Sequence, residues 1–517
     1  MPPVSWHPIY ELLTRYGIDH GSAKSLANND LRNWELNDIA AILKRIQRPS
    51  REYCYFRTPN LVLSTDSIDF KRWWPSLWVD ASVKWISPPR TLMEQSARDS
   101  TALCVNEAGK WSLRTSGYVA FSHVWIEGLQ RDYINDGVEM QKFRAIFKLL
   151  KGRKIEAEWV WSDVLVIPSI GGPASRPEDE MLKIDMINQL PLVYSRADAV
   201  IIIDALVLQL HPKEPLDVAV ALACGNWASR VWTYQEIKLA SRALILTATD
   251  SYDFEELVSV LKCLEVEDYN RFHNLWLRFG IMAKDEEQGL SIPDIVMACG
   301  ERRAGQDVDY ARAFFPVLGL EWEYGMTREQ GMQKIYNSFK RHASRVACFY
   351  GAPRMSIQPR WAPSYFHDLE GYVTEPMEWK DRGIRGEWYA VRVASVQSTF
   401  KNAGRFVFDF DFDCEGDRCM QCACAPNEDK KIIKTFEAAV QRGKCYVLSA
   451  EPSKDARNVE RARTAMLVEE NYGQEMNGFE VAVHCAAIIA SQNHHFESKQ
   501  SVLLRHQGPM QDDACGN

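Results

Sequence analysis

Residues 118–125 have the sequence Tyr118-Val-Ala-Phe-Ser-His-Val-Trp125, and residues 199–206 have the sequence Ala199-Val-Ile-Ile-Ile-Asp-Ala-Leu206. Both are apolar runs of strand length, and a third, Trp159-Val-Trp-Ser-Asp-Val-Leu-Val-Ile-Pro168, lies between them. In the segments between these runs, apolar residues recur at the spacing typical of helices. Short, largely apolar strands that alternate with helices favour a parallel sheet covered by helices on both faces. The sequence therefore predicts an α/β fold.

The alternation extends from residue 117 to residue 249. We expect Pro191 to end or kink the second helix of this series, because proline lacks the amide hydrogen that continues a helix. The expected strands are 118–124, 158–167, 199–206 and 242–247, and the expected helices are about 134–151, 178–195 and 214–224.

The chain has 517 residues, more than the roughly 250–300 that one hydrophobic core supports, so several folding units are expected. Thr327 is expected to begin a helix as its N-cap, and so is Ser291. Further helices are expected at 254–264, 272–282, 292–299, 311–320 and 332–348, and further strands at 387–393, 405–412, 445–448 and 479–489. The expected divisions are a helical extension at 1–50, a domain at 51–250 with core motifs at 117–249, a helical region at 251–360, a β-rich C-terminal unit at 361–493 and a flexible tail at 494–517.

Composition narrows the class of protein. Apolar residues make up 46% of the chain, which is enough to build cores. The net charge of −8 arises from interspersed acidic and basic residues, so nucleic acid is not an expected partner. The apolar run that begins at Ala199 is interrupted by Asp204 after about five residues, against the ~20 that span a bilayer. Thirteen scattered cysteines indicate a reducing compartment, and we expect a cytoplasmic protein without a membrane span or cofactor.

Polar residues interrupt the apolar strands near their carboxyl ends. Ser122 and His123 end the first strand, Asp163 lies in the second and Asp204 in the third, each about one βα unit further along. Ligands bind beyond the carboxyl ends of parallel strands. We therefore expect these side chains, together with Glu236, to meet at one cleft.

Four ordered motifs lie within this stretch, and they are Gly117-Tyr-Val-Ala-Phe-Ser-His-Val-Trp125, Trp161-Ser-Asp-Val-Leu-Val-Ile-Pro168, Tyr194-Ser-Arg-Ala-Asp198 and Arg230-Val-Trp-Thr-Tyr-Gln-Glu236. Together they resemble the fungal heterokaryon incompatibility (HET) domain over roughly residues 85–250. The resemblance implies a filamentous fungus, non-self recognition and cell-death signalling. It also implies a sheet similar to flavodoxin and to TIR domains, some of which cleave nicotinamide from NAD with one glutamate.

The resemblance implies roles for the polar cluster. Glu236 matches the glutamate that would stabilise a ribosyl oxocarbenium ion, so we predict Glu236 and His123 as catalytic residues. The residues predicted to bind substrate act by hydrogen bonds, ring stacking or charge, and are Ser122, Trp125, Asp163, Asp204, Arg230 and Trp232.

Each of these residues also has a structural interpretation. Glu236 and Arg230 can form an ion pair at a helix start, and His123 can donate to a core carbonyl. Asp163 and Asp204 can cap the following helices, and the tryptophans can be core residues. Two positions depart from the family pattern. Val166 stands where the family has cysteine, and Ile126 and Glu127 precede Gly128, whereas the family usually has glycine directly after the Ser-His-Val-Trp motif. A non-catalytic member of the family is therefore an alternative.

Three functions remain open at this point. The protein can signal by assembly with itself or with protein partners, it can cleave NAD, or it can act as an enzyme on another small molecule in the same crevice. A Ser122, His123 and Asp163 hydrolase triad is disfavoured, because adjacent side chains on a strand point to opposite faces.

Two patterns in the C-terminal part have alternatives of their own. Cys414, Cys419, Cys422 and Cys424 are either zinc ligands at irregular spacing or reduced thiols, and no metal site is predicted. Residues 409–413 are expected to form an alternating strand rather than a calcium loop.

Overall fold

The computed structural model divides the chain into two compact units. The first comprises Met1–Gly289, Glu301–Ala304 and Ala313–Gly325, and the second comprises Leu290–Gly300, Gly305–Arg312 and Met326–Asn517. The residues that the structure describes are 8–15, 20–28, 30–46, 85–124, 137–168, 176–204, 206–283, 292–299, 302–349, 352–367, 369, 374–401, 405–412, 418–424, 430–449, 463–475, 478–491 and 499–505.

The first unit is built on a seven-stranded sheet with the order β3-β2-β6-β4-β7-β8-β9. The pairs β6–β4, β4–β7 and β7–β8 are parallel, and antiparallel strands lie at both edges. The predicted α/β class with a largely parallel sheet is thereby confirmed. The strands are β2 (Ala102–Asn106), β3 (Trp111–Arg114), β4 (Val119–His123), β6 (Trp159–Trp161), β7 (Ala199–Ile203), β8 (Ala243–Leu246) and β9 (Ser251–Asp253).

The strand order places a switch point beside β4. After β4 the chain adds β6 on one side, and it then crosses to add β7 and β8 on the other side. Helices that leave neighbouring strands at such a point diverge, and this opens a crevice beyond the carboxyl ends of the strands. The carboxyl ends of β4 and β7 are therefore the place where the fold favours a ligand site.

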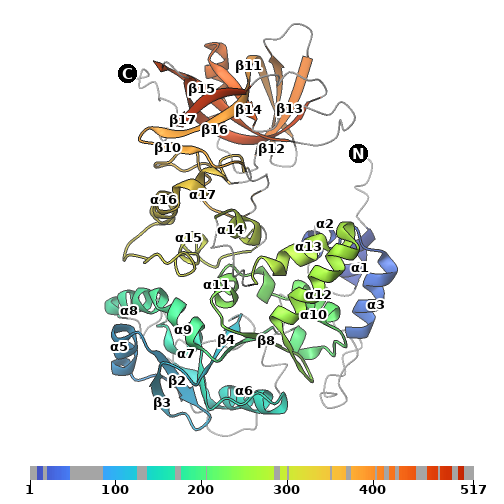
Figure 1. Ribbon diagram of the computed structural model, residues 1–517, viewed down its shortest axis with the longest axis vertical. Coiled ribbons are helices and arrows are strands. Elements are labelled where there is room, and N and C mark those ends of the chain that lie inside the picture. Colours follow the sequence, from blue (N-terminus) through green and yellow to red (C-terminus); the bar gives the residue numbers. More distant parts are fainter. Residues whose placement is uncertain are drawn as a thin grey trace. The chain divides into compact units, whose positions relative to one another are not determined.

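Helices flank this sheet on two sides (Figure 1). The strands lie between a group that includes α5, α8 and α9 and a group that includes α10, α12 and α13. The helices that follow β1 (Trp85–Ile86) are α5 (Arg90–Asp99), α6 (Met140–Gly152, after β5, Val138–Glu139), α7 (Asp163–Val166), α8 (Pro177–Asn188), α9 (Leu190–Arg196), α10 (Pro215–Cys224), α11 (Trp232–Lys238), α12 (Phe254–Glu267) and α13 (Tyr269–Gly280), with the short 3-10 helices η5 (Val207–Gln209) and η6 (Trp227–Ser229).

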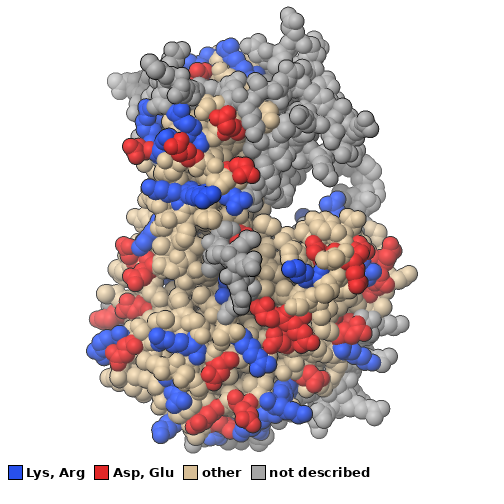
Figure 2. All heavy atoms as spheres, viewed as in Figure 1, with Lys and Arg blue, Asp and Glu red and all other residues tan. Residues whose placement is uncertain are grey.

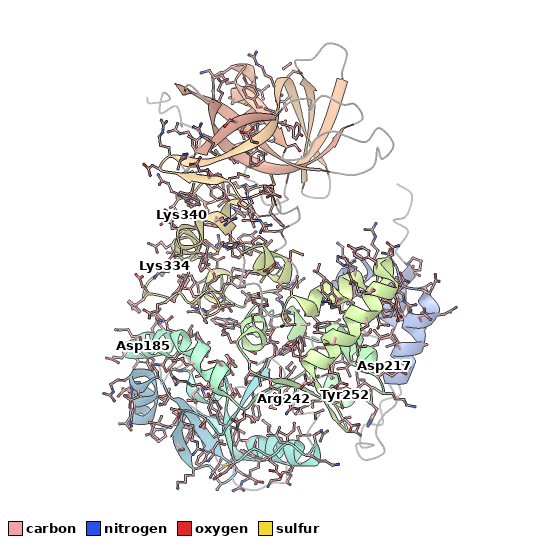
Figure 3. All side chains as sticks on the ribbon, viewed as in Figure 1. Asp185, Asp217, Arg242, Tyr252, Lys334 and Lys340 are labelled. Atoms are coloured by element: carbon pink, nitrogen blue, oxygen red, sulfur yellow. The ribbon has the colours of Figure 1, made fainter. Side chains whose placement is uncertain are left out.

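Helix α10 is apolar on nearly all sides and is buried from Asp217 to Cys224. Asp217 lies close enough to Tyr252 of β9 that its charge, after burial and Asp250, raises the pKa of the phenol; Figure 3 labels both side chains on this side of the sheet. The N-terminal helices α1 (Pro8–Arg15), α2 (His20–Asn28) and α3 (Leu36–Ile46) belong to the same unit, and α2 and α3 contact α10.

Three predicted elements of the first unit differ from the structure. The helix predicted from about residue 134 begins at Met140, after Val138 and Glu139 of β5. The predicted strand at 158–167 ends at Trp161, and Asp163–Val166 form α7 instead. Asp163 Oδ1 accepts the amide hydrogen of Val164 at 2.7 Å, a local bond that competes with strand pairing. The predicted helix at 178–195 is two helices that meet at Gln189, with Pro191 at the start of α9 as expected from its missing amide hydrogen.

The second unit carries a sheet whose pairing closes on itself. The path β11-β12-β13-β16-β15-β14 returns to β11, because β11 pairs with β12 along one part of its length and with β14 along another. The strands are β10 (Glu378–Lys380), β11 (Gly383–Lys401), β12 (Arg405–Phe412), β13 (Arg418–Cys424), β14 (Cys445–Ser449), β15 (Arg463–Glu475), β16 (Gly478–Ser491) and β17 (Lys499–Arg505).

Two predicted helices in this part of the chain are interrupted, whereas the helix predicted at 292–299 is present with those bounds. The predicted helix at 311–320 ends at Arg312, and the predicted helix at 332–348 is divided at Phe339. Ser291 lies outside the described residues. The helices are α14 (Ile292–Cys299), α15 (Asp309–Arg312), α16 (Arg328–Ser338), α17 (Lys340–Ser344) and α18 (Lys430–Gln441).

The surface charges are mixed, and the helices are short or polar, as expected from the sequence. Lys and Arg side chains are interspersed with Asp and Glu side chains on the face of the first unit drawn in Figure 2. Within the part of the chain that the structure describes, every helix is too short or too polar to cross a membrane.

Candidate functional site

Strand β4 brings two polar side chains to the switch point. Ser122 is fully buried and His123 is 7% exposed, although they stand in a strand whose other residues are apolar. Neighbouring strand residues point to opposite faces. Accordingly, Ser122 and His123 contact different partners.

Ser122 contacts Glu236 of α11. The Ser122 hydroxyl donates a hydrogen bond to Oε2 of Glu236, and its own oxygen accepts the indole N–H of Trp227 at 2.6 Å. The turn between η6 and α11 is fixed by Thr233, whose hydroxyl donates to the carbonyls of Trp227 and Arg230 at 3.0 and 2.8 Å. Residues 114 positions apart therefore meet at the end of β4.

Burial makes Glu236 a weak acid. The side chain is only 5% exposed, and desolvation raises its pKa to about 8. The nearby charge of Asp163 raises it as well, whereas the Ser122 hydrogen bond and the positive charges of Arg230 and Arg302 lower it. At neutral pH the buried Glu236 is therefore largely protonated.

Tyr194 of α9 completes the surroundings of Glu236. Its hydroxyl lies within hydrogen-bonding reach of Glu236, and burial and the Glu236 charge hold the pKa of the phenol well above its usual value. The ring packs edge-on against Trp161 at the end of β6, with 5.4 Å between the ring centres. Tyr194 therefore places a second, neutral hydroxyl beside the carboxyl group.

His123 contacts Asp163. Its Nδ1 lies 3.8 Å from Oδ1 of Asp163, the first residue of α7. The Asp163 side chain is 19% exposed, compared with 3% for the His123 side chain. Among these acidic and imidazole groups, Asp163 is the one nearest to solvent.

Asp204 follows β7 and binds backbone amides. Its Oδ1 accepts the N–H of Leu206 at 2.9 Å and of Val207 at 3.1 Å, and its Oδ2 accepts the N–H of Trp227 at 3.0 Å. These bonds hold η5 and η6 against the end of β7. They match the capping interpretation of Asp204 more closely than the substrate-binding one.

The remaining predicted residues fall into different places. Arg230 follows η6 as its C-terminal capping residue, and its carbonyl accepts a hydrogen bond from Arg302 at 2.9 Å. Trp232 is the half-buried first residue of α11. Trp125 and Cys414 lie outside the described residues, as do the side chains of Cys419, Cys422 and Cys424. Among the residues that the structure does describe, no group of three or more acidic, histidine or cysteine side chains could hold a metal ion.

Three contributors were not predicted from the sequence. Tyr194 belongs to one of the HET-like motifs, but the spacing of apolar residues in α9 does not show which of its side chains faces α11. Trp227 precedes the Arg230 motif by three residues, and only the 3-10 turn of η6 brings its indole to β4. Arg302 comes from a segment far along the chain, for which local sequence carries no signal.

Comparison of the chain with protein-family models, with curated proteins and with solved structures gave no match. The function of the chain is therefore inferred from the geometry of this cluster and from the motif resemblance.

Proposed function

We propose that this chain is a fungal HET-type protein of non-self recognition and cell-death signalling, and that Glu236 is the reactive group of its TIR-like α/β unit. The observation that supports this most strongly is the hydrogen bond between Ser122 and Glu236 at the switch point of the sheet. Both residues belong to the HET-like motifs, and the fold favours a ligand at the place where they meet.

The chemistry that suits one buried carboxyl group is cleavage of nicotinamide from NAD. The bond between ribose C1′ and the ring nitrogen breaks, and its electron pair goes to the positively charged nicotinamide, which leaves as a neutral molecule. Water then bonds to C1′ and loses a proton. Because the leaving group needs no acid, a single carboxylate that stabilises the oxocarbenium ion is sufficient.

The two carboxyl groups at this site suit a cationic ligand. Burial and the charge of Asp163 oppose the ionisation of Glu236, whereas the charges of Arg230 and Arg302 favour it. A positive ring placed between the two carboxyl groups would lower the pKa of Glu236 and convert it to the anion that the reaction requires. The ligand would thereby activate the group that acts on it.

Near-complete burial of the cluster favours a second function. Ser122 is 0% exposed and Glu236 is 5% exposed, so the pair can serve to fix α11 against β4 while the surface of the unit assembles with itself or with other proteins. In that case the cluster supports a signalling surface and performs no reaction.

Nicotinamide release from NAD by the full chain distinguishes the two functions. We expect the wild type to release nicotinamide and Glu236→Gln to lose at least about 100-fold in rate, since a group that stabilises the transition state is removed. Glu256→Gln on the exposed face of α12 is the matched control and should retain the wild-type rate. Equal release by the wild type and Glu236→Gln would reject the catalytic role. Toxicity on overexpression that survives Glu236→Gln would favour assembly.

A further inference from the structure

A chain of buried hydrogen bonds leads from the end of β7 to Glu236. It begins at the Asp204 carboxylate, passes through the main chain and the indole of Trp227, and ends with the hydroxyl of Ser122 on Glu236. We propose that Asp204 and Trp227 are positioning residues of this site, which act by fixing the direction of the Ser122 hydroxyl. This inference rests on the proposed function of Glu236.

The first step is the anchoring of Trp227 by Asp204. Asp204 is 1% exposed, and its Oδ2 accepts the Trp227 N–H while its Oδ1 holds two amides of the η5 turn. Gly225 lies against this carboxylate so closely that a Cβ atom there would overlap both oxygens. The absence of a side chain at residue 225 therefore lets the turn approach Asp204.

The second step is the orientation of the indole. Trp227 is 0% exposed and packs edge-on against Phe254, with 6.5 Å between the ring centres. An indole has one polar atom, and that N–H is a donor only. In this buried position it points at Ser122 Oγ, 2.6 Å away.

The third step concerns the hydroxyl itself. A serine hydroxyl can rotate, so by itself it can either donate to or accept from its neighbours. At Ser122 the oxygen already accepts the Trp227 N–H, and the hydroxyl hydrogen is directed to Glu236 Oε2. The indole therefore makes Ser122 a donor toward Glu236, which favours the ionised carboxylate.

Other groups also face Glu236, and they act separately from the hydrogen-bonded arm that Asp204, Trp227 and Ser122 form. Asp163 opposes ionisation by its negative charge, with His123 beside it, and Tyr194 offers a second hydroxyl. Arg230 and Arg302 favour ionisation by their positive charges. Because Ser122 hydrogen-bonds to Trp227 and Glu236 rather than to these side chains, removal of the indole N–H tests the arm alone.

Titration of Glu236 in variants of the full chain provides the test. The chain is labelled with carbon-13 at the glutamate carboxyl groups, and the Glu236 resonance is assigned from its loss in Glu236→Gln. Trp227→Phe removes the N–H but keeps an aromatic ring, and Ser122→Ala removes the hydroxyl. We expect each variant to raise the pKa of Glu236, because each weakens a hydrogen bond to the carboxylate.

The double variant separates positioning from packing. If the indole acts through the hydroxyl, Trp227→Phe produces no further shift once Ser122 is alanine. Trp322→Phe is the matched control: it replaces another buried indole, packed on Phe315, and should leave the resonance unmoved. Nicotinamide release should fall about three- to tenfold in Trp227→Phe, as for one lost positioned hydrogen bond.

The outcomes are distinct. The arm is overturned if Glu236 titrates in Trp227→Phe as it does in the wild type. It is also overturned if Trp227→Phe shifts the pKa of Glu236 equally in the wild type and in Ser122→Ala. Should the wild type release no nicotinamide, the proposed reaction fails, yet the titration still decides whether Trp227 positions Ser122. If Trp227→Phe does not fold, the Ser122→Ala titration decides, and an unchanged pKa there also overturns the arm.

Discussion

At the scale of single residues, folding places Glu236 where a negative charge is costly. Its pKa rises from the ordinary 4.5 to about 8, chiefly because of burial. Between these two values the folded chain keeps a proton that the unfolded chain releases, so stability falls as pH rises, by up to about 1.4 kcal/mol per pH unit. Above about pH 8 both states have released it, and no further loss occurs.

Glu236→Gln should remove this loss, because glutamine resembles the protonated acid and does not ionise. We expect the variant to match the wild type near about pH 5 and to be more stable than it near about pH 9, by on the order of a few kcal/mol. Urea unfolding at both values measures the difference. Parallel stability curves for the two proteins would mean that Glu236 ionises freely in the folded state.

Gly225 tests the packing of the η6 turn on Asp204. Gly225→Ala should lower the free energy of unfolding by about 1–3 kcal/mol, because the new methyl group would overlap the carboxylate. Gly152→Ala at the end of α6 is the matched control: its Cβ would meet nothing within 4 Å, so it should be neutral or stabilising by up to about 1 kcal/mol. Equal stability of the two variants would contradict this placement of the turn.

At the scale of elements, apolar runs predicted the strands well where their residues are buried on both faces. Strand β7 is buried from Ala199 to Ile203 and ends where Asp204 begins to bind amides, so the apolar run and the strand nearly coincide. The run after Trp159 was misassigned because Val164 to Val166 are buried in a helix, and a short buried helix is as apolar as a strand. Only the local bond of Asp163 distinguishes the two.

The cap of α16 was predictable because its signal is local. Thr327 Oγ1 accepts the amide hydrogen of Gln330 at 3.3 Å, and Gln330 Oε1 accepts that of Thr327 at 2.8 Å. Thr327→Ala should cost about 1 kcal/mol of stability, while Thr327→Ser, which keeps the oxygen, should cost less. Differential scanning calorimetry of both variants measures this, and an unchanged transition in Thr327→Ala would show that the cap adds no stability.

At the scale of the whole molecule, the two units each have their own set of internal contacts. Domains of this size usually fold around separate cores. We therefore expect Thr327→Ala to shift a different part of the calorimetric profile from Gly225→Ala. A single transition that both variants move alike would mean that the units unfold as one.

The assembly of the site was predictable only in part. The spacing of about one βα unit predicted that Ser122 and Asp204 lie at the same end of the sheet, with Glu236 near Ser122. In the structure they lie at that end, and Ser122 hydrogen-bonds to Glu236. Trp227 and Arg302 reach the cluster through a 3-10 turn and a distant segment, and neither position has a period or spacing that reveals it. The sequence pattern thus predicted which strand ends matter, whereas the hydrogen-bond partners depend on three-dimensional packing.

Nicotinamide release from NAD, measured against pH, tests the role of Glu236 most directly. The ionised carboxylate is the reactive form, and a bound cation lowers its pKa, so the rate should rise with pH and reach half its maximum below about pH 8. Glu236→Gln should show no such rise at any pH. Release that is independent of pH, or equal in the wild type and Glu236→Gln, would contradict the account.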